Sequence, residues 1–445
     1  MKKGKAGIFT LSSTSLMICE CLISIVVIFL DTFLVSKLMQ LTPGDYTNVS
    51  LFNFIYYAVL AVTVFAFTPL LLKINKSLFM SIGALFLAGT FIAVYLLNDQ
   101  LSNFIWLFGI LSGFSYGLFC AGFNNLIGEV ISSKHQTIYF SVKNIVIFLT
   151  KTIFPFILGA VIDLGSFAVL CIVIAVICVM MLIFSFLVKP KNSVKKSYNM
   201  IKFWKLIKQG KEETKPLKLL YLSGFFRGLC FDLIATVFTI LIFLQYSGSD
   251  FTIGLLQTIF TATQMISMFL FMKFYHKNRS QWFIFISLGL IVASSIPVFI
   301  SHNTISILIF YGVYMFFRVF ITTVTDMRKT PIIRLLSMHS HTLEHNSTYS
   351  IIYGLTRASS YLSLLLFFVV PEWIMINITL AINIFGYIGY SITLYLLERK
   401  LILQDIKWKK EHPDPVITQD EKTEISEKNI EVLPKEMERI EIKKS

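Results

Sequence analysis

Long apolar stretches, each close to the length that spans a lipid bilayer, recur along most of the sequence. Of the 445 residues, 56% are hydrophobic and only 14% are charged, whereas soluble domains carry about 25% charged residues. A helix needs roughly 20 apolar residues to cross the hydrocarbon of a membrane. We therefore predict an all-α polytopic membrane protein with twelve spans. The predicted spans are residues 11–38, 49–72, 77–97, 104–128, 139–162, 166–188, 217–243, 251–274, 282–300, 305–325, 347–370 and 374–397.

Lysine and arginine lie almost entirely on one side of these spans. Six loops on the other side contain none of the 39 Lys and Arg residues, and 31 of the 39 lie in the opposite loops and the termini. Loops rich in Lys and Arg stay in the cytoplasm, so both termini are predicted to be cytoplasmic. The formal net charge of +14 then follows from topology, and we expect no nucleic-acid partner.

A basic segment divides the spans into two groups of six. The predicted parts are an N-terminal bundle at 1–188, a cytoplasmic linker at 189–216, a C-terminal bundle at 217–400 and a charged cytoplasmic tail at 401–445. Residues 200–208 of the linker can form an amphipathic helix on the inner leaflet. We favour a tether between the halves over a regulatory site for this linker.

Two short matches relate the halves to each other. Residues 40–47, after the first span, match 245–252, after the seventh span, at an offset of 205. Residues 149–151 in the fifth span match 355–357 in the eleventh at an offset of 206. Two matches at nearly one offset indicate an internal duplication.

This organisation resembles the major facilitator superfamily over about residues 8–400. The resemblance rests on two six-span halves joined by a long basic loop. The segment 69–76 keeps the basic residues Lys73 and Lys76 of the family's pattern between the second and third spans, but it lacks the usual Gly and Asp. The resemblance implies two six-helix bundles related by pseudo-twofold symmetry that rock about a central cavity and give alternating access.

Seven charged residues lie well inside the predicted spans, where a charge costs on the order of 3 kcal/mol or more unless it faces a cavity or a partner. Lys37 and Lys143 lie nearer to span ends, where we expect them to snorkel to the surface. The seven deeper residues are Glu20, Asp31, Lys151, Arg227, Asp232, Arg318 and Arg357.

The three acidic residues of this set are candidates for proton coupling. Glu20 and Asp31 are eleven residues apart, which is about three helical turns and places them on one face roughly 16 Å apart. They can serve as two proton stations on one route, with Asp232 as a third candidate. The alternative is that each neutralises a basic residue on a neighbouring helix.

The four cations Lys151, Arg357, Arg227 and Arg318 are candidates for substrate binding. Lys151 and Arg357 occupy matching positions in the duplication, and the family resemblance places their spans along the cavity wall. Two such cations suit an anionic group, because Arg offers bidentate contact and Lys a point charge. The alternative pairs them internally with Asp31 and Asp232.

One motif is typical of an enzyme, and a motif typical of ATP-driven pumps is absent. Residues 341–345 match H-x-x-E-H, a zinc-peptidase pattern, but a match this short arises by chance and we expect no enzyme and no metal site. The sequence has no G-x-x-x-x-G-K phosphate loop, which excludes an ATP-driven pump of that type.

The sequence thus predicts a secondary active transporter that moves a small solute by alternating access. We expect proton coupling, an anionic or zwitterionic substrate, and no cofactor. We also expect a monomer in contact with membrane lipids, and the composition suits a bacterial plasma membrane. The alternatives are a multidrug or metabolite efflux permease of the same fold and a non-transporting membrane sensor or accessory protein.

Overall fold

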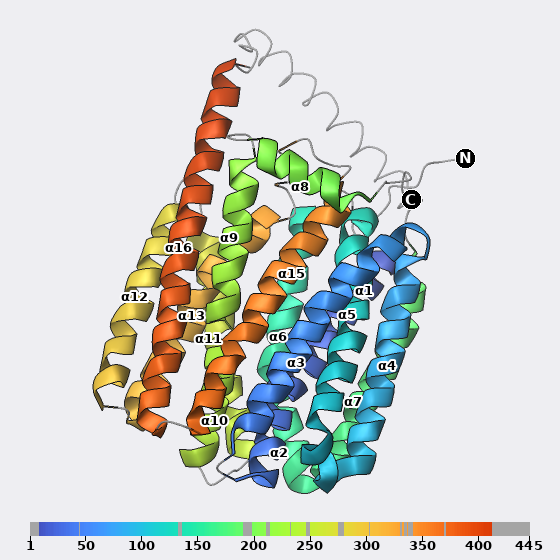
Figure 1. The fold of residues 1–445 in the computed structure, drawn as a ribbon, viewed down its shortest axis with the longest axis vertical. Coiled ribbons are helices and arrows are strands. Elements are labelled where there is room, and N and C mark those ends of the chain that lie inside the picture. Colours follow the sequence, from blue (N-terminus) through green and yellow to red (C-terminus); the bar gives the residue numbers. More distant parts are fainter. Residues whose placement is uncertain are drawn as a thin grey trace, which may run out of the picture. The chain divides into compact units, whose positions relative to one another are not determined.

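The computed structural model is all-α, with long helices that lie side by side (Figure 1). It describes residues 9–43, 45–131, 136–189, 198–210, 214–231, 233–245, 250–274, 280–301, 303–329, 332, 336, 341–368 and 371–411. The α-helices are α1 (Leu11–Ile28), α2 (Leu34–Leu41), α3 (Thr47–Phe67), α4 (Lys76–Leu97), α5 (Ile105–Val130), α6 (Gln136–Leu164), α7 (Phe167–Leu187), α8 (Met200–Gln209), α9 (Lys215–Cys230), α10 (Leu233–Gln245), α11 (Asp250–Phe274), α12 (Ser280–Ser301), α13 (Thr304–Lys329), α15 (Thr342–Tyr361) and α16 (Glu372–Glu411). Residues up to Glu398 form one compact unit, and α16 continues into a second.

The twelve predicted spans are confirmed as helical segments in the part of the chain that the structure describes. Ten stretches there are long and apolar enough to cross a membrane, and one of them, Lys76–Ile127, contains both α4 and most of α5. The eleventh predicted span corresponds to α15, which is not among these stretches. This helix is more polar than the others because it carries residues such as Glu344, His345 and Arg357.

The first helix of each half is interrupted, although the sequence predicted continuous spans. In the first half, α1 passes into α2 through a π-helical turn at Phe29–Phe33, which contains Asp31. In the second half, α9 ends at Cys230 and α10 begins at Leu233. A π-turn widens the helix by one residue and is frequent at functional sites.

At the second interruption, backbone carbonyl groups accept hydrogen bonds from side chains of neighbouring helices. The Tyr314 hydroxyl donates to the carbonyl oxygens of Cys230 at 2.7 Å and Phe231 at 3.1 Å. The amide of Asn383 also donates to the Cys230 oxygen. In a membrane such replacement partners are required, since no water is present to bond a free carbonyl.

The two halves meet along two symmetric pairs of helices. In one pair α6, the fifth span, packs against α11, the eighth span. In the other pair α15, the eleventh span, packs against α3, the second span. Each pair thus joins the fifth span of one half to the second span of the other half. Contact is close in both pairs. A Cβ at Gly254 of α11 would lie 2.5 Å from the carbonyl oxygen of Pro155 on α6, and a Cβ at Gly354 of α15 would lie 2.5 Å from the Cβ of Ala61 on α3.

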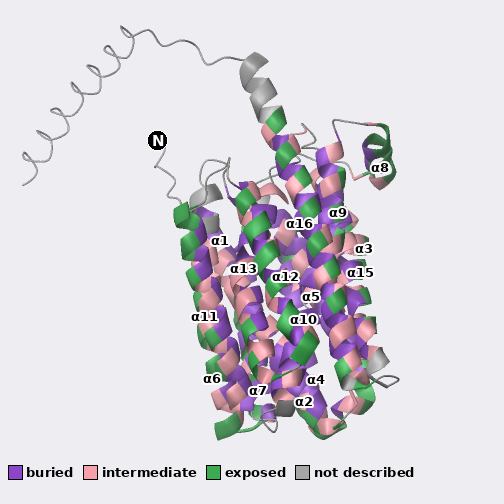
Figure 2. Ribbon diagram, turned by 90° about the vertical axis from the view of Figure 1, so that its left-hand side faces the viewer, coloured by how far each residue is buried: buried purple, intermediate pink, exposed green. Residues whose placement is uncertain are grey.

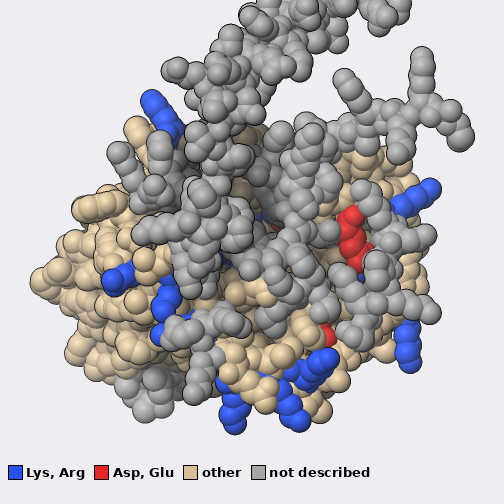
Figure 3. Space-filling model, turned by 90° about the horizontal axis from the view of Figure 1, so that it is seen from above, with Lys and Arg blue, Asp and Glu red and all other residues tan. Residues whose placement is uncertain are grey.

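The linker helix α8 lies across one end of the bundle, which we call the α8 end (Figure 1). Within α8, the side chains of Phe203 and Ile207 are buried, whereas those of Ile201 and Trp204 are exposed. Figure 2 shows the same division, with buried and exposed residues alternating around α8. Among the described residues visible from this end, Lys and Arg side chains lie around the rim and outnumber Asp and Glu side chains (Figure 3).

Candidate functional site

A charged bridge joins the two halves near the middle of their spans. Arg357 of α15 donates from Nη2 to the hydroxyl of Tyr57 on α3, and that hydroxyl donates to Oδ1 of Asp31 at 2.8 Å. The same Arg357 nitrogen lies 3.9 Å from Oδ2 of Asp31. The Arg357 guanidinium also lies over the Tyr57 ring, with 3.5 Å between its carbon and the ring centroid.

This bridge brings together one predicted proton-coupling residue and one predicted substrate-binding residue. The side chains are 14% exposed for Arg357 and 25% for Asp31, so their charges attract each other with little screening by water. Protonation of Asp31 would neutralise its carboxylate and remove that attraction. The Arg357 guanidinium could then bind another anion. The arrangement can therefore bind a proton and an anionic ligand together at one place.

Glu20 belongs to a second ion pair, nearer to the α8 end. Its Oε1 accepts a hydrogen bond from Nζ of Lys143 on α6 at 2.9 Å, with side chains 19% and 12% exposed. The expectation that Lys143 only snorkels to the surface is therefore wrong, because its partly buried side chain forms an ion pair with Glu20. Glu20 and Asp31 contact different helices, since Asp31 contacts α3 and α15.

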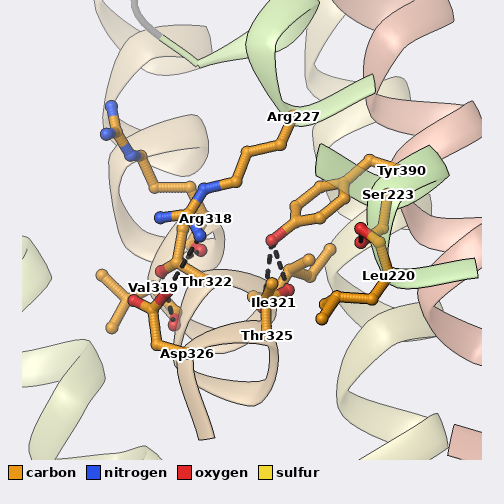
Figure 4. Close-up of polar contacts among 10 residues, drawn as sticks. All are labelled: Leu220, Ser223, Arg227, Arg318, Val319, Ile321, Thr322, Thr325, Asp326 and Tyr390. Carbon is orange, nitrogen blue, oxygen red and sulfur yellow. Dashed lines mark hydrogen bonds and ion pairs between the residues drawn. The ribbon is translucent and has the colours of Figure 1, made fainter. Parts of the chain in front are cut away.

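Arg227 and Arg318 lie close together in the C-terminal half (Figure 4). Nη1 of Arg227 bonds Oδ1 of Asp326 on α13 at 2.9 Å. The guanidinium of Arg318 lies over the Phe231 ring, 4.9 Å from its centroid, and reaches the Phe231 carbonyl at 3.5 Å. Arg318 thus contacts the interruption between α9 and α10, while Arg227 forms an ion pair.

The remaining candidates are placed less fully. Lys151 lies partly buried midway along α6, in the half opposite to Arg357. Asp232 lies outside the described residues, at the interruption between α9 and α10.

The end opposite to α8 is closed by a buried carboxylate. Asp250, the first residue of α11, accepts hydrogen bonds from Ser36 at 2.5 Å and from Gln40 at 3.0 Å, both on α2. Asp250 is 8% exposed. These bonds cross from one half to the other, so they stabilise the conformation in which this end is shut. Asp250 lies in the segment 245–252 that matches 40–47, but this sequence match does not indicate that Asp250 bonds Ser36 and Gln40.

The H-x-x-E-H motif packs the linker against the bundle. Glu344 is fully buried and accepts the backbone N–H of Asn199 at 2.8 Å, just before α8. His345 uses both ring nitrogens, one with the Tyr221 hydroxyl at 3.0 Å and one with the Lys329 carbonyl at 3.1 Å. Both nitrogens therefore have partners within the protein, which fits a structural role.

Sequence reasoning missed three partners at these sites, namely Tyr57, Asp326 and Ser36. Tyr57 lies in an apolar span rich in aromatic residues, and no sequence feature distinguishes it from the other aromatic residues there. Asp326 follows the predicted end of its span by one residue, so extending that span at the α8 end would have found it. Ser36 carries no signal, because serine is common in membrane helices.

Comparison with known proteins identifies the family. The model of the Major Facilitator Superfamily matches residues 16–365. Two similar solved structures have TM-scores of 0.55. One is a bacterial homologue of the iron transporter ferroportin in an inward-facing state, at 15% identity, covering 87% of this chain and 98% of its own. The other is the human organic anion transporter MFSD10 (TETRAN), at 11% identity, covering 88% of this chain and 98% of its own.

At such low identity the two structures support the fold alone, and among curated proteins none matches the sequence. The family model covers most of the chain, including both symmetric pairs of packed helices. The family is one of transporters rather than enzymes, and its fold agrees with the twelve helical spans described above. The chain therefore belongs to the major facilitator superfamily and is a multi-pass membrane transporter.

Proposed function

We propose that this transporter moves a small anionic or zwitterionic solute by alternating access, coupled to protons, in a bacterial plasma membrane with both termini in the cytoplasm. Arg357 binds the anionic group of the substrate and Asp31 carries the proton. The observation that carries the proposal is the bridge from Asp31 through Tyr57 to Arg357, which joins the halves near mid-span. Lys151, at the symmetric position in α6, is the second cation proposed to contact the substrate.

The two interrupted helices support this location. Transporters place their binding sites near the midplane at interrupted helices in corresponding positions of the two halves. Here the π-turn contains Asp31, and the break between α9 and α10 lies about one helical turn from the position that the duplication pairs with Asp31. We assign the supporting roles accordingly. Arg318 stabilises the break between α9 and α10 through its contacts with Phe231, and Arg227 forms an ion pair with Asp326 nearby. Asp232 and Glu20 are further candidates for proton transfer.

The proposed cycle alternates between two partners of Arg357. With Asp31 ionised, the guanidinium is held by the carboxylate and by Tyr57. When Asp31 takes up a proton, the guanidinium binds a carboxylate or phosphate group of the substrate instead, which Arg recognises well. Proton and anion then enter together, and the halves rock around the occupied site.

Binding and transport measurements on purified protein test the proposal. A thermal-shift screen against carboxylates, phosphates, amino acids and cationic drugs should find stabilisation by anions or zwitterions, since a ligand that binds the folded state raises its stability. Arg357→Met, alone or with Lys151→Met, should remove that stabilisation and abolish uptake into proteoliposomes. Asp31→Asn should keep counterflow but lose the dependence of uptake on a pH gradient.

Lys37→Met is the matched control, because it removes another membrane cation. Lys37 bonds Asp99 at 3.2 Å, and Asp99 is 77% exposed at the opposite end. This variant should transport normally. Stabilisation by cationic drugs alone, or normal uptake by the Lys151→Met/Arg357→Met variant, would refute the proposed anion site.

A further inference from the structure

A groove runs along the exposed side of α8 and onto the start of α9. It has a volume of about 680 Å³. Its apolar lining includes Met200, Ile201 and Trp204, and its charged lining consists of Lys205 and Lys208 of α8 and Lys218 of α9. None of the described residues that line it is acidic. The groove therefore combines an apolar floor with three ammonium groups.

The walls of the groove are held in place by contacts beneath α8. The helix begins with a cap in which the Asn199 side chain accepts the N–H of Lys202 at 2.8 Å. Phe203 is fully buried, with its ring 5.6 Å from the ring of His341. Glu344 bonds the backbone of Asn199. The groove is thus built on the ordered end of α15 rather than on a loose connection.

The exposed side chains of the groove lie at the level where the spanning helices end. Ile201 is 73% exposed and Trp204 is 43% exposed. Large apolar side chains are unfavourable in water, but tryptophan is enriched at the boundary between lipid and water. The position and the lining both fit the head-group region of a bilayer.

We propose that the groove of α8 and α9 binds an anionic phospholipid. The acyl chain lies along Met200, Ile201 and Trp204, and the phosphate is held by Lys205, Lys208 and Lys218. A soluble anion would use only the lysines and leave the apolar floor in water. A zwitterionic lipid would gain little from three lysines, whereas an anionic lipid is attracted by each of them. The proposal is independent of the substrate and of proton coupling.

Native mass spectrometry of the full-length protein in detergent, titrated with dioleoyl phosphatidylglycerol or dioleoyl phosphatidylcholine, tests the site. We expect phosphatidylglycerol to bind at least tenfold more tightly. Lys205→Gln/Lys208→Gln/Lys218→Gln should lose this preference. The control is Lys73→Gln/Lys189→Gln/Lys273→Gln, which removes three exposed lysines from the same end of the molecule, outside the groove, and should keep it.

Further binding measurements distinguish a lipid from a soluble anion, and measurements of folding control for misfolded variants. Trp204→Ala should weaken binding of phosphatidylglycerol, while soluble glycerol phosphate should bind weakly to every variant. Unchanged circular dichroism and thermal unfolding will establish that the triple variants fold; should the groove variant unfold, Lys218→Gln alone takes its place. Equal binding of the two lipids, equal losses in groove and control variants, or tight glycerol phosphate binding that survives Trp204→Ala would each overturn the proposal.

Discussion

At the scale of single residues, Tyr57 connects the charges of the two halves. Its hydroxyl accepts a hydrogen bond from Arg357 and donates one to Asp31, and its ring lies beneath the guanidinium. One side chain therefore orients both the proposed anion-binding group and the proposed proton carrier. A ligand that enters must displace at least one of these bonds, so the hydroxyl should affect transport more than folding.

The substitution Tyr57→Phe tests this role. It keeps the ring beneath Arg357 but removes two hydrogen bonds to charged groups, each worth about 1.5–3 kcal/mol. We expect the initial rate of transport into proteoliposomes to fall about tenfold or more, since 1.4 kcal/mol corresponds to a factor of ten. Tyr56→Phe is the control, because the Tyr56 ring is only 4.6 Å from that of Tyr57. Equal effects of the two substitutions would contradict a specific role of the Tyr57 hydroxyl.

Arg328 and Glu398 form a bidentate pair that should govern stability. Nε of Arg328 bonds one carboxylate oxygen at 2.5 Å and Nη2 the other at 2.8 Å. The Glu398 side chain is fully buried and also accepts a bond from Ser280 at 2.9 Å. Removing one partner leaves the other as a buried charge without an ion-pair partner, whereas replacing both with apolar side chains leaves no buried charge.

We therefore expect Arg328→Met to lower the free energy of unfolding by about 3–5 kcal/mol, seen as a lower midpoint of thermal unfolding in detergent. The double variant Arg328→Met/Glu398→Met should recover most of that loss. If the double variant is no more stable than Arg328→Met, the penalty does not come from the stranded carboxylate.

These residues show what a single sequence reveals about charges in a membrane. Glu20, Asp31 and Arg357 stand out because a charge in an apolar span is costly. Their partners do not stand out, because a pairing depends on which faces of distant helices meet. Lys143 lies near a span end, where the sequence predicts that its ammonium reaches the surface. Nothing in the sequence distinguishes Tyr57 from the other aromatic residues of its span.

At the scale of elements, the interruptions in the first helix of each half were not predictable from composition. Residues 11–38 and 217–243 are apolar on nearly every side, so no periodic pattern could reveal a π-turn or a break. Tertiary contacts decide these features. In the second half, Tyr314 and Asn383 bond the carbonyl of Cys230, and both come from helices far along the chain.

The close contact of α6 with α11 makes Gly254 a sensitive position. A Cβ there would lie 2.5 Å from the Pro155 oxygen, and this backbone atom can move only if the helices separate. Overpacking costs about 1–3 kcal/mol, so Gly254→Ala should disfavour closure of the opposite end by roughly five- to hundredfold. A membrane-impermeant thiol reagent should then label a cysteine at position 36 faster.

Gly289→Ala is the matched control for this experiment. It makes the same change in a membrane helix, but no heavy atom lies within 4 Å of the added Cβ. Labelling at position 36 should be unchanged by it. If Gly254→Ala leaves labelling unchanged as well, α6 and α11 do not form the closing contact.

At the scale of the whole molecule, the twelve spans and their division into two sets of six were predictable. The loop charges fixed the count, and the duplication paired the halves. How the halves contact each other was not predicted, since hydropathy contains no information on helix neighbours and the family resemblance implied only two bundles around a central cavity. The structure adds contacts between the halves at both ends, with Ser36 and Asp250 at one end and Asn125 and Asn346, 3.0 Å apart, toward the α8 end.

Alternating access requires each of these contacts to open in turn, which cross-linking can test. Cysteines at 36 and 250, or at 125 and 346, joined by a short bifunctional thiol reagent, should each abolish transport, and reduction should restore it. A control pair at 81 and 185 joins α4 to α7 within one half, where the serine oxygens lie 2.7 Å apart, and should transport when cross-linked. The rates are compared before and after cross-linking in a background without the six native cysteines. Transport that continues with the halves joined at either end would exclude rocking of the two bundles, because a fixed contact at one end permits opening only at the other.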